Sequence, residues 1–175
     1  MTESMQLATR TPQILAQVDE GSVRNQFLTF SLGGEVLAIE IRFIKEILQF
    51  GNITEVPLTP LALRGVMNLR GAVIPVIDLA VRFGRQATVT DRRTCIVILE
   101  VEEGDATTVM GIVVDHVSEV LDIADADIEP APAFGGTLRP DFVRGVGKIA
   151  GRFVILLDIE RVLSAEELGK FELET

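Results

Sequence analysis

LRGVMNLRGAVIPVIDLAVRF, residues 63–83, has a second copy of its pattern 80 positions further along the chain. The copy is VRGVGKIAGRFVILLDIERVL, residues 143–163, and the two segments align without a gap. The identical positions pair Arg64 with Arg144, Gly65 with Gly145, Val66 with Val146, Gly71 with Gly151 and Asp78 with Asp158. An internal repeat of this kind indicates a duplicated structural unit.

A weaker repeat precedes each of these segments. LAIEIRFIKEIL (37–48) aligns with MGIVVDHVSEVL (110–121) at an offset of 73 positions. Each repeat therefore consists of a hairpin, a short connector, an Arg-Gly turn and a buried strand that ends in aspartate. The simplest fold is two similar small barrels. Because each half is too short to bury a sufficient core alone, we expect an apolar seam shared by the barrels.

The local patterns predict an all-β protein. FLTFSLGGEVLAIEI (27–41) alternates apolar and polar residues around Gly33-Gly34, which predicts a hairpin with a two-residue turn. RFIKEILQF (42–50) fits either a short helix or a strand. AVIPVIDL, RTCIVILEV and TTVMGIVVD are β-branched runs typical of buried strands. Several short strands with few helical patterns indicate a barrel or a sandwich.

The domain boundaries follow from the ends of these patterns. Residues 1–24 have no sustained periodicity and are expected to form a mobile extension. Residues 25–168 are expected to form the folded domain, and residues 169–175 a tail. SAEELGKFEL begins with a serine and two glutamates, which predicts a short C-terminal helix in addition to short helical connectors.

Composition excludes several classes of partner. The 175 residues carry a net charge of −10, and the chain has no Trp or Tyr, so neither nucleic acid nor an anionic membrane surface is an expected partner. The apolar runs are too short and interrupted to cross a bilayer, and the N-terminus lacks a secretory pattern. A single cysteine cannot form an internal disulfide, so a cytoplasmic location is expected.

Metal and cofactor chemistry has little support in the sequence. Cys95 and His116 are the only Cys and His, which are too few for a zinc site. DIADADIEP (122–130) lacks the central glycine and terminal glutamate of a calcium loop, so it is interpreted as a solvated acidic turn. Cys95 lies in an apolar strand pattern and is expected to be a buried, inert thiol. No phosphate-binding glycine pattern is present, and no cofactor is expected.

Three residues keep a catalytic alternative open. Asp78 and Asp158 resemble an acid–base pair, but the repeat gives each the same place in its own half. Such an aspartate usually accepts hydrogen bonds from the turn that follows its strand. His116 follows Asp115 directly, and neighbours in a strand point to opposite faces. A Ser-His-Asp site assembled by the fold remains an alternative, although no nucleophile motif supports it.

Arg70 differs from the other residues of the Arg-Gly motifs. Arg64-Gly65 recurs as Arg144-Gly145 and therefore belongs to the repeated scaffold. Arg70 does not recur, because Ala150 takes its place before Gly151. An arginine found in one half only, beside a turn glycine, suggests an interaction site, since guanidinium groups pair with carboxylates in fixed geometry.

The motifs together resemble the CheW family of chemotaxis adaptors. The resemblance is carried by FLTFSLGGEVLAIEIRFIKEIL, RGVMNLRGAVIPVIDL, GIVVDHVSEVL, IEPAPAF and VRGVGKIAGRFVILLDIERVL, and it covers about residues 25–165. It implies two five-stranded SH3-like barrels and no catalysis. It also implies two partners, the regulatory domain of a CheA-type histidine kinase and the cytoplasmic tip of a chemoreceptor. The family members are monomers in isolation and alternate with kinase domains in rings beneath the receptors.

The resemblance also implies site residues. The arginine of the NLRG motif falls on Arg70, the connector glutamate on Glu46 and the glycine of the first Arg-Gly pair on Gly65. We expect an Arg70–Glu46 charge pair at the edge of a receptor groove. The expected apolar lining is Ile44, Ile47, Val113, Val114 and Val117. Ile53 and Val56 are apolar residues in a polar loop and are predicted to contact the kinase.

The sequence departs from the family in its N-terminal extension and in the long acidic loop of LEVEEGDATTVM. Two other functions remain alternatives. One is a related adaptor of another kinase pathway, such as twitching motility or development. The other is a small-molecule-binding or hydrolytic domain that uses Asp78, Asp158 or His116.

Overall fold

The computed structural model describes residues 26–57, 62–131 and 138–164, and within these ranges the chain is almost entirely β-structure. The strands are β1 (Gln26–Leu32), β2 (Glu35–Glu40), β3 (Ile44–Gln49), β4 (Leu63–Leu69), β5 (Ala72–Asp78), β6 (Cys95–Glu103), β7 (Ala106–Val114), β8 (His116–Asp122), β9 (Ile128–Glu129), β10 (Val143–Ile149) and β11 (Arg152–Leu157). The helical turns are η2 (Ile41–Phe43), α2 (Leu79–Arg82), η3 (Asp125–Asp127), η4 (Pro140–Phe142) and α3 (Ile159–Val162).

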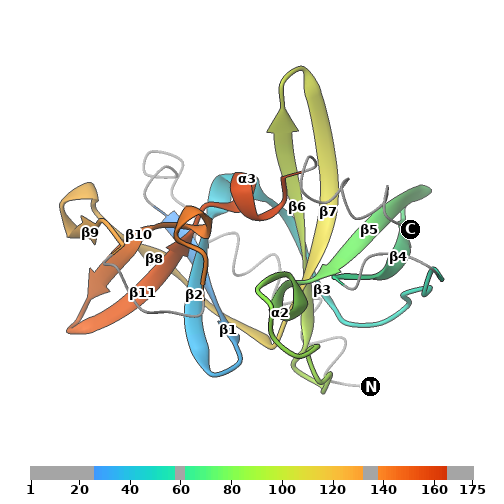
Figure 1. Ribbon diagram of the computed structural model, residues 1–175, viewed down its shortest axis with the longest axis horizontal. Coiled ribbons are helices and arrows are strands. Elements are labelled where there is room, and N and C mark those ends of the chain that lie inside the picture. The colour runs from blue at the N-terminus through green and yellow to red at the C-terminus, as the bar shows by residue number, and fades with distance from the viewer. Residues whose placement is uncertain (1–25, 58–61, 132–137, 165–175) are drawn as a thin grey trace.

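The strands form two sheets that lie side by side in Figure 1. One sheet has the order β3-β6-β7-β5-β4 and is called the first barrel here. The other has the order β8-β1-β2-β11-β10-β9 and is called the second barrel. The predicted all-β fold with two similar SH3-like units is confirmed. The segment 42–50, left open between helix and strand, forms η2 followed by β3.

The two repeats exchange their hairpins. The β1–β2 hairpin of the first repeat lies in the second barrel, where β2 pairs in parallel with β11. The β6–β7 hairpin of the second repeat lies in the first barrel, where β7 pairs in parallel with β5. The registers are equivalent, since Leu156 faces Ala38 in one barrel and Val76 faces Gly111 in the other. Each barrel therefore needs strands from both halves of the chain.

The predicted apolar seam is the largest of three hydrophobic clusters. It contains one face of β1, β2, β6 and β7 together with residues of α2 and α3. A smaller cluster fills each barrel, with Ile96, Ile98 and Val113 in the first and Phe27, Val154 in the second. Alternation along the strands separates these layers, because successive side chains of one strand point to opposite faces.

A hydrogen bond and an aromatic contact also cross the seam near α2 and α3. The guanidinium of Arg82 in α2 donates a hydrogen bond to the carbonyl of Val162 in α3, at 2.8 Å. Phe83 and Phe142 pack with ring centroids 5.6 Å apart. Arg82 and Val162 occupy equivalent positions of the two repeats, so this contact lies near the pseudo-twofold axis that relates them. The predicted helix in SAEELGKFEL and the extension 1–24 lie outside the described residues.

Two glycines permit the closest backbone contacts in the barrels. A Cβ on Gly65 would lie 2.4 Å from the carbonyl oxygen of Thr54, and one on Gly145 would lie 2.8 Å from that of Glu129. The reason is that Thr54 pairs with Val66 and Glu129 with Val146, which brings a second backbone over each glycine. The glycine of each Arg-Gly motif is thus required because a side chain there would collide with the facing backbone.

The two aspartates that end strands have the same capping geometry, which confirms that they are structural residues. Asp78 precedes α2 and accepts hydrogen bonds from the backbone N–H groups of Ala80 and Val81. Asp158 precedes α3 and accepts one from Arg161. Asp78 is also buried and binds the guanidinium of Arg64 at 2.8 Å. Each aspartate therefore caps the turn that follows its own strand.

We expect Gly65→Ala to lower the free energy of unfolding by about 2–4 kcal/mol, because the new methyl group meets a backbone oxygen that cannot move freely. Gly104→Ala is the control, since it also has positive φ but open space around it; it should cost about 1–2 kcal/mol. Urea unfolding followed by circular dichroism gives both values. Equal losses in the two variants would contradict the steric explanation.

Asp78→Ala should destabilise the protein more than Asp158→Ala. The first substitution removes a helix cap and a buried ion pair, for an expected loss of about 2–4 kcal/mol. The second removes mainly a cap at a half-exposed position, for about 0.5–2 kcal/mol. Thermal and urea unfolding of both variants measures the difference, and a larger effect of Asp158→Ala would show that this ranking is wrong.

Candidate interaction site

A bidentate ion pair lies at the surface of the first barrel. The two terminal nitrogens of Arg70 donate to the two carboxylate oxygens of Glu46 at 2.7 and 2.9 Å. The side chain of Arg70 is 73% exposed, whereas that of Glu46 is 22% exposed. Both oxygens of Glu46 are therefore engaged, while the far side of the guanidinium faces solvent. The predicted charge pair is present in the structure.

The turn between β4 and β5 determines where Arg70 points. Arg70 has φ of 50° and Gly71 has φ of 89°, the conformation of a two-residue hairpin turn with positive φ at both positions. This conformation is uncommon for a residue with a side chain. The hydrogen bonds that the guanidinium donates to Glu46 raise the pKa of Arg70 above its usual value.

The second barrel has the same turn without the ion pair. Ala150 and Gly151 have φ of 50° and 77°, which reproduces the backbone of Arg70-Gly71. The position equivalent to Glu46 is Glu119, which is exposed in β8. The repeat therefore supplies the turn and the carboxylate in both barrels and the arginine in only one. This asymmetry distinguishes Arg70 from the scaffold residues.

Most of the predicted apolar lining lies in the interior. Ile47 belongs to the seam and is 1% exposed, and Val113 and Val114 are fully buried. Their strand β7 is central in its sheet, so Val113 points into the first barrel and Val114 into the seam. Val117 is also buried. The expectation that these four side chains line an open groove disagrees with their burial. Strand β7 is covered on both faces, and Ile47 and Val117 take inward positions of β3 and β8.

The remaining predicted receptor residues are Ile44, two positions before Glu46, and Gly65 in β4. Ile44 is half-buried at the start of β3 and packs against the seam. The β3–β6 register is irregular between Ile44 and Glu46, which alters the alternation at this point. Gly65 is buried beneath Thr54 and contributes by letting the two backbones approach. Its side-chain-free position supports the barrel and offers no contact of its own.

The two residues predicted to contact the kinase differ in exposure. Ile53 is half-buried, packs against the core of the first barrel and has its Cγ2 over Gly65. Val56 is 38% exposed in the segment that follows. Thr54, between them, pairs with Val66 and fixes this segment to β4. Of the two, only Val56 offers substantial apolar surface to another molecule.

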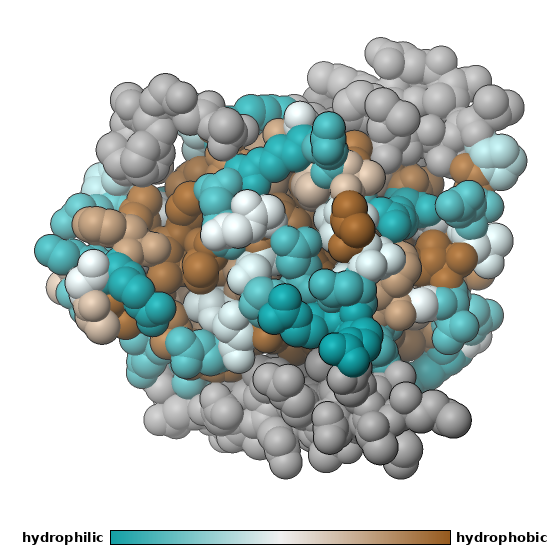
Figure 2. All heavy atoms as spheres, turned by 90° about the horizontal axis from the view of Figure 1, so that it is seen from below, coloured by the Kyte–Doolittle hydropathy of each residue, from teal (hydrophilic) through white to brown (hydrophobic). Residues whose placement is uncertain are grey.

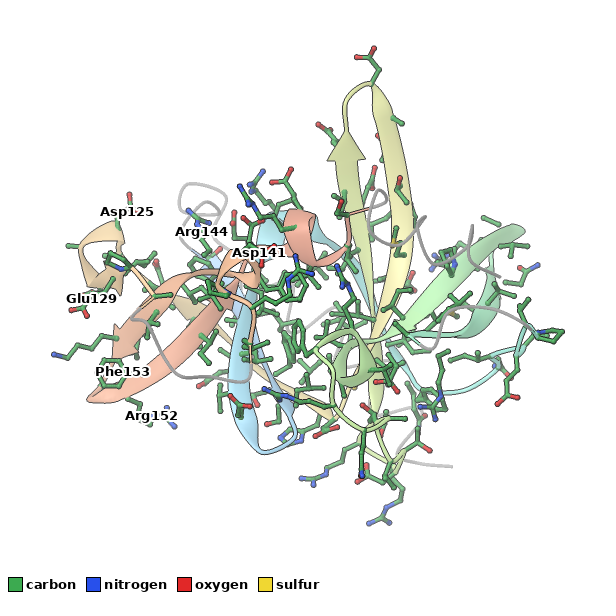
Figure 3. All side chains as sticks on the ribbon, in the orientation of Figure 1. Asp125, Glu129, Asp141, Arg144, Arg152 and Phe153 are labelled. Atoms are coloured by element: carbon green, nitrogen blue, oxygen red, sulfur yellow. The ribbon has the colours of Figure 1, made fainter. Side chains whose placement is uncertain are left out.

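Sequence reasoning missed the two most exposed apolar side chains of the hairpins that carry the Arg-Gly motifs. Val73 at the start of β5 is 70% exposed, and Phe153 at the start of β11 is 63% exposed. They occupy equivalent positions of the repeat, and Figure 3 shows Phe153 beside Arg152 at the outer end of the second barrel. The alignment at an offset of 80 pairs these two positions, but their exposure depends on where each strand ends relative to its neighbours, which the sequence pattern does not give.

The residues of the catalytic alternative are not assembled into a reactive site. Asp78 and Asp158 cap separate helices. His116 has its Nε2 3.1 Å from the hydroxyl oxygen of Ser31, but the carboxylate of Asp115 accepts a hydrogen bond from the N–H of Gly33 at 2.8 Å. The aspartate is therefore engaged by the β1–β2 turn, and it does not orient the imidazole. Cys95 is buried, as predicted.

The surface mixes polar and apolar groups. On the face shown in Figure 2, hydrophobic side chains lie in patches between hydrophilic ones. The most exposed large apolar residues are Val36, Val56, Val73, Val89 and Phe153. Within the part of the chain that the structure describes, no helix is long and apolar enough to span a membrane.

Comparison with known proteins identifies the fold and the family together. Residues 26–167 match the CheW-like domain. The chain is 40% identical to the chemotaxis protein CheW of Klebsiella aerogenes over 148 residues, which is 85% of this chain and 87% of that protein. It is 33% identical to the chemotaxis protein CheW of Rhizobium meliloti over 81% of this chain and 89% of that protein.

Two further comparisons extend the range of relatives. Protein FrzA of Myxococcus xanthus is 29% identical over 79% of this chain and 84% of that protein. The crystal structure of the scaffolding protein TtCheW from Thermoanaerobacter tengcongensis is 32% identical and superposes with a TM-score of 0.71, covering 81% of this chain and 88% of that one. The chain therefore belongs to the CheW-like domain family.

Proposed function

We propose that this protein is a non-catalytic adaptor that couples the cytoplasmic tips of chemoreceptors to a CheA-type histidine kinase. Membership in the CheW-like family and the similarity to a protein described as a scaffold support the adaptor role. The single observation that supports receptor binding is the exposed Arg70–Glu46 pair, which is present in one repeat and absent from the equivalent turn of the other. In this proposal the protein acts in the cytoplasm, is a monomer in isolation and enters rings with the kinase beneath the receptors.

The receptor contact is proposed to centre on Arg70. Glu46 holds the guanidinium in one orientation, so that its free edge is preorganised for a carboxylate or a carbonyl of the receptor helix. Ile44 supplies the adjacent half-buried apolar surface. Ile47, Val113, Val114 and Val117 act indirectly in this scheme, because they fix β3, β7 and β8 from the interior. Gly65 acts in the same indirect way.

The kinase contact is proposed to use Val56 and the exposed part of Ile53. Both lie on the segment that crosses β4, on the same barrel as Arg70. Because the barrels share one continuous seam, a receptor and a kinase bound to this molecule would be held in a fixed relation. A small receptor movement could then change the activity equilibrium of the kinase. Modest interfaces of this kind gain strength from repetition in an array.

A second candidate function is the same adaptor role in another kinase pathway, such as twitching motility or development. The presence of Protein FrzA among the relatives, alongside proteins named for chemotaxis, favours keeping it. The two candidates use the same surfaces and differ in partners. Binding assays with the CheA-type domain and with regulatory domains of other kinases from the same organism distinguish them.

Arg70→Ala and Glu46→Ala should each weaken binding to a receptor cytoplasmic fragment by roughly tenfold or more, the effect of losing a central charged contact. Binding to the kinase regulatory domain should remain within about twofold. Arg139→Ala is the matched control, since Arg139 also forms an exposed bidentate pair, with Asp141 at 2.6 and 3.1 Å. Biolayer interferometry with both partners measures these constants. Unchanged receptor binding by both variants, or an equal loss in the control, would contradict the proposed site.

Val56→Asp should have the opposite selectivity. A charge at this apolar position would weaken binding of the kinase regulatory domain by roughly tenfold and leave receptor binding unchanged. The control is Val89→Asp, because Val89 is 89% exposed and lies on a different loop. The same immobilised partners serve for this measurement. Kinase binding that survives Val56→Asp would move the kinase contact to another surface, such as that of Phe153.

A further inference from the structure

Because each barrel contains a hairpin from the other repeat, the two halves of the chain complete each other's sheets. The first repeat contributes β1 to β5, and the second contributes β6 to β11. Between the halves, β1 pairs with β8, β2 with β11, β3 with β6, and β5 with β7. One covalent connection joins them, the linker of residues 84–94 between α2 and β6. Every other contact between the halves is non-covalent.

Two points attach the linker to its own repeat. The Arg85 guanidinium binds Glu35 at 2.5 Å, and the Arg85 N–H donates to the carbonyl of Ala80 at 2.9 Å. Thr88 forms the second attachment, which is buried. The N–H of Thr88 donates to one carboxylate oxygen of Asp78 at 3.0 Å, and its hydroxyl donates to the other at 3.2 Å. Arg64 contacts both the Thr88 carbonyl at 3.2 Å and the Asp78 carboxylate at 2.8 Å. Thr88 is 7% exposed, although its linker neighbours Ala87 and Val89 are exposed. We call this arrangement the Asp78–Thr88 clasp.

We propose that two copies of this chain can form a dimer by exchanging halves, and that the Asp78–Thr88 clasp favours packing of the two halves within one chain. In an exchanged dimer, the first repeat of one chain packs with the second repeat of the other. Every strand pairing and the whole apolar seam are formed in both states. The balance therefore depends on the linker and on protein concentration.

The clasp limits how far the linker reaches. With Thr88 fixed to Asp78, residues 89–94 are the part of the linker between this attachment and β6. Six extended residues span at most roughly 20–22 Å, whereas the nine residues 86–94, between Arg85 and β6, span at most roughly 30–32 Å. Releasing Thr88 would thus lengthen the reach between the two halves by about half. An exchanged dimer would also carry two copies of the Arg70–Glu46 pair and become a bivalent connector.

The first experiment is refolding of the full chain at high concentration, followed by size-exclusion chromatography with light scattering. Thr88→Pro removes both donors to Asp78 and leaves the Asp78–Arg64 pair in place. We expect a dimer fraction several-fold above wild type that increases with concentration. Thr88→Ser keeps both donors, and Thr90→Pro adds a proline to the linker without touching the clasp; both should match wild type.

A disulfide distinguishes exchange from association through surfaces. Gln49 in β3 of the first repeat faces Cys95 in β6 of the second, within the usual Cα separation of a disulfide. After Gln49→Cys and oxidation, a closed monomer forms this bond inside one chain. An exchanged dimer forms it between two chains and migrates as a covalent dimer without reductant. The protein with Cys95 alone is the control for unspecific oxidation.

The outcome of the cross-linking test is decisive in either background. A covalent dimer joined between residues 49 and 95, more abundant in Thr88→Pro than in the wild-type background, supports the proposal. A dimer that separates into monomers without reductant shows surface association and overturns it. If Thr88→Pro does not recover native circular dichroism, the wild-type background alone is used. Absence of any covalent 49–95 dimer there, at every refolding concentration, likewise overturns the proposal.

Discussion

The seam between the barrels is the constraint on which the structure depends. Each barrel takes a hairpin from one repeat and its remaining strands from the other, so neither repeat can complete a sheet alone. The same apolar faces of β1, β2, β6 and β7 then bury one another between the sheets. Strand pairing and core formation are consequently one event. The two described barrels therefore share one continuous core, which suits the proposed adaptor role.

The proposed interaction site lies where the two repeats differ. Asp78 and Asp158, Gly65 and Gly145, and the two hairpin turns recur because the backbone requires them. Arg70 occupies a turn position that Ala150 fills equally well in the other barrel, so folding does not demand an arginine there. Comparing equivalent positions within one chain thus separates side chains that the fold requires from candidates for an interaction site. No family alignment is needed for that separation.

The sequence predicted the elements well, because their causes are local. The Gly33-Gly34 turn, the buried strands and the capping aspartates each follow from a few neighbouring residues. The exchange of hairpins did not follow, since the repeat is compatible with either pairing of hairpin and strand. The run TTVMGIVVD was predicted to be a buried strand, but the family resemblance also placed Val113 and Val114 in a groove. The strand order decides between the two, because β7 is covered on both faces. Phe153 went unnoticed because exposure depends on where a strand ends relative to its neighbours.

The parallel pairing of β2 with β11 has a consequence for synthesis on the ribosome. Leu37 pairs with Ile155, so β2 of the first hairpin cannot form its pairing with β11 until almost the whole described chain has been synthesised. At translation rates of about 5–20 residues per second, the roughly 120 intervening residues emerge over about 6–24 seconds. During that interval the backbone edge of β2 has no native partner, and the apolar face of β1 and β2 is uncovered until β6 and β7 emerge. An open strand edge beside an exposed apolar face is the kind of surface that chaperones shield on a nascent chain.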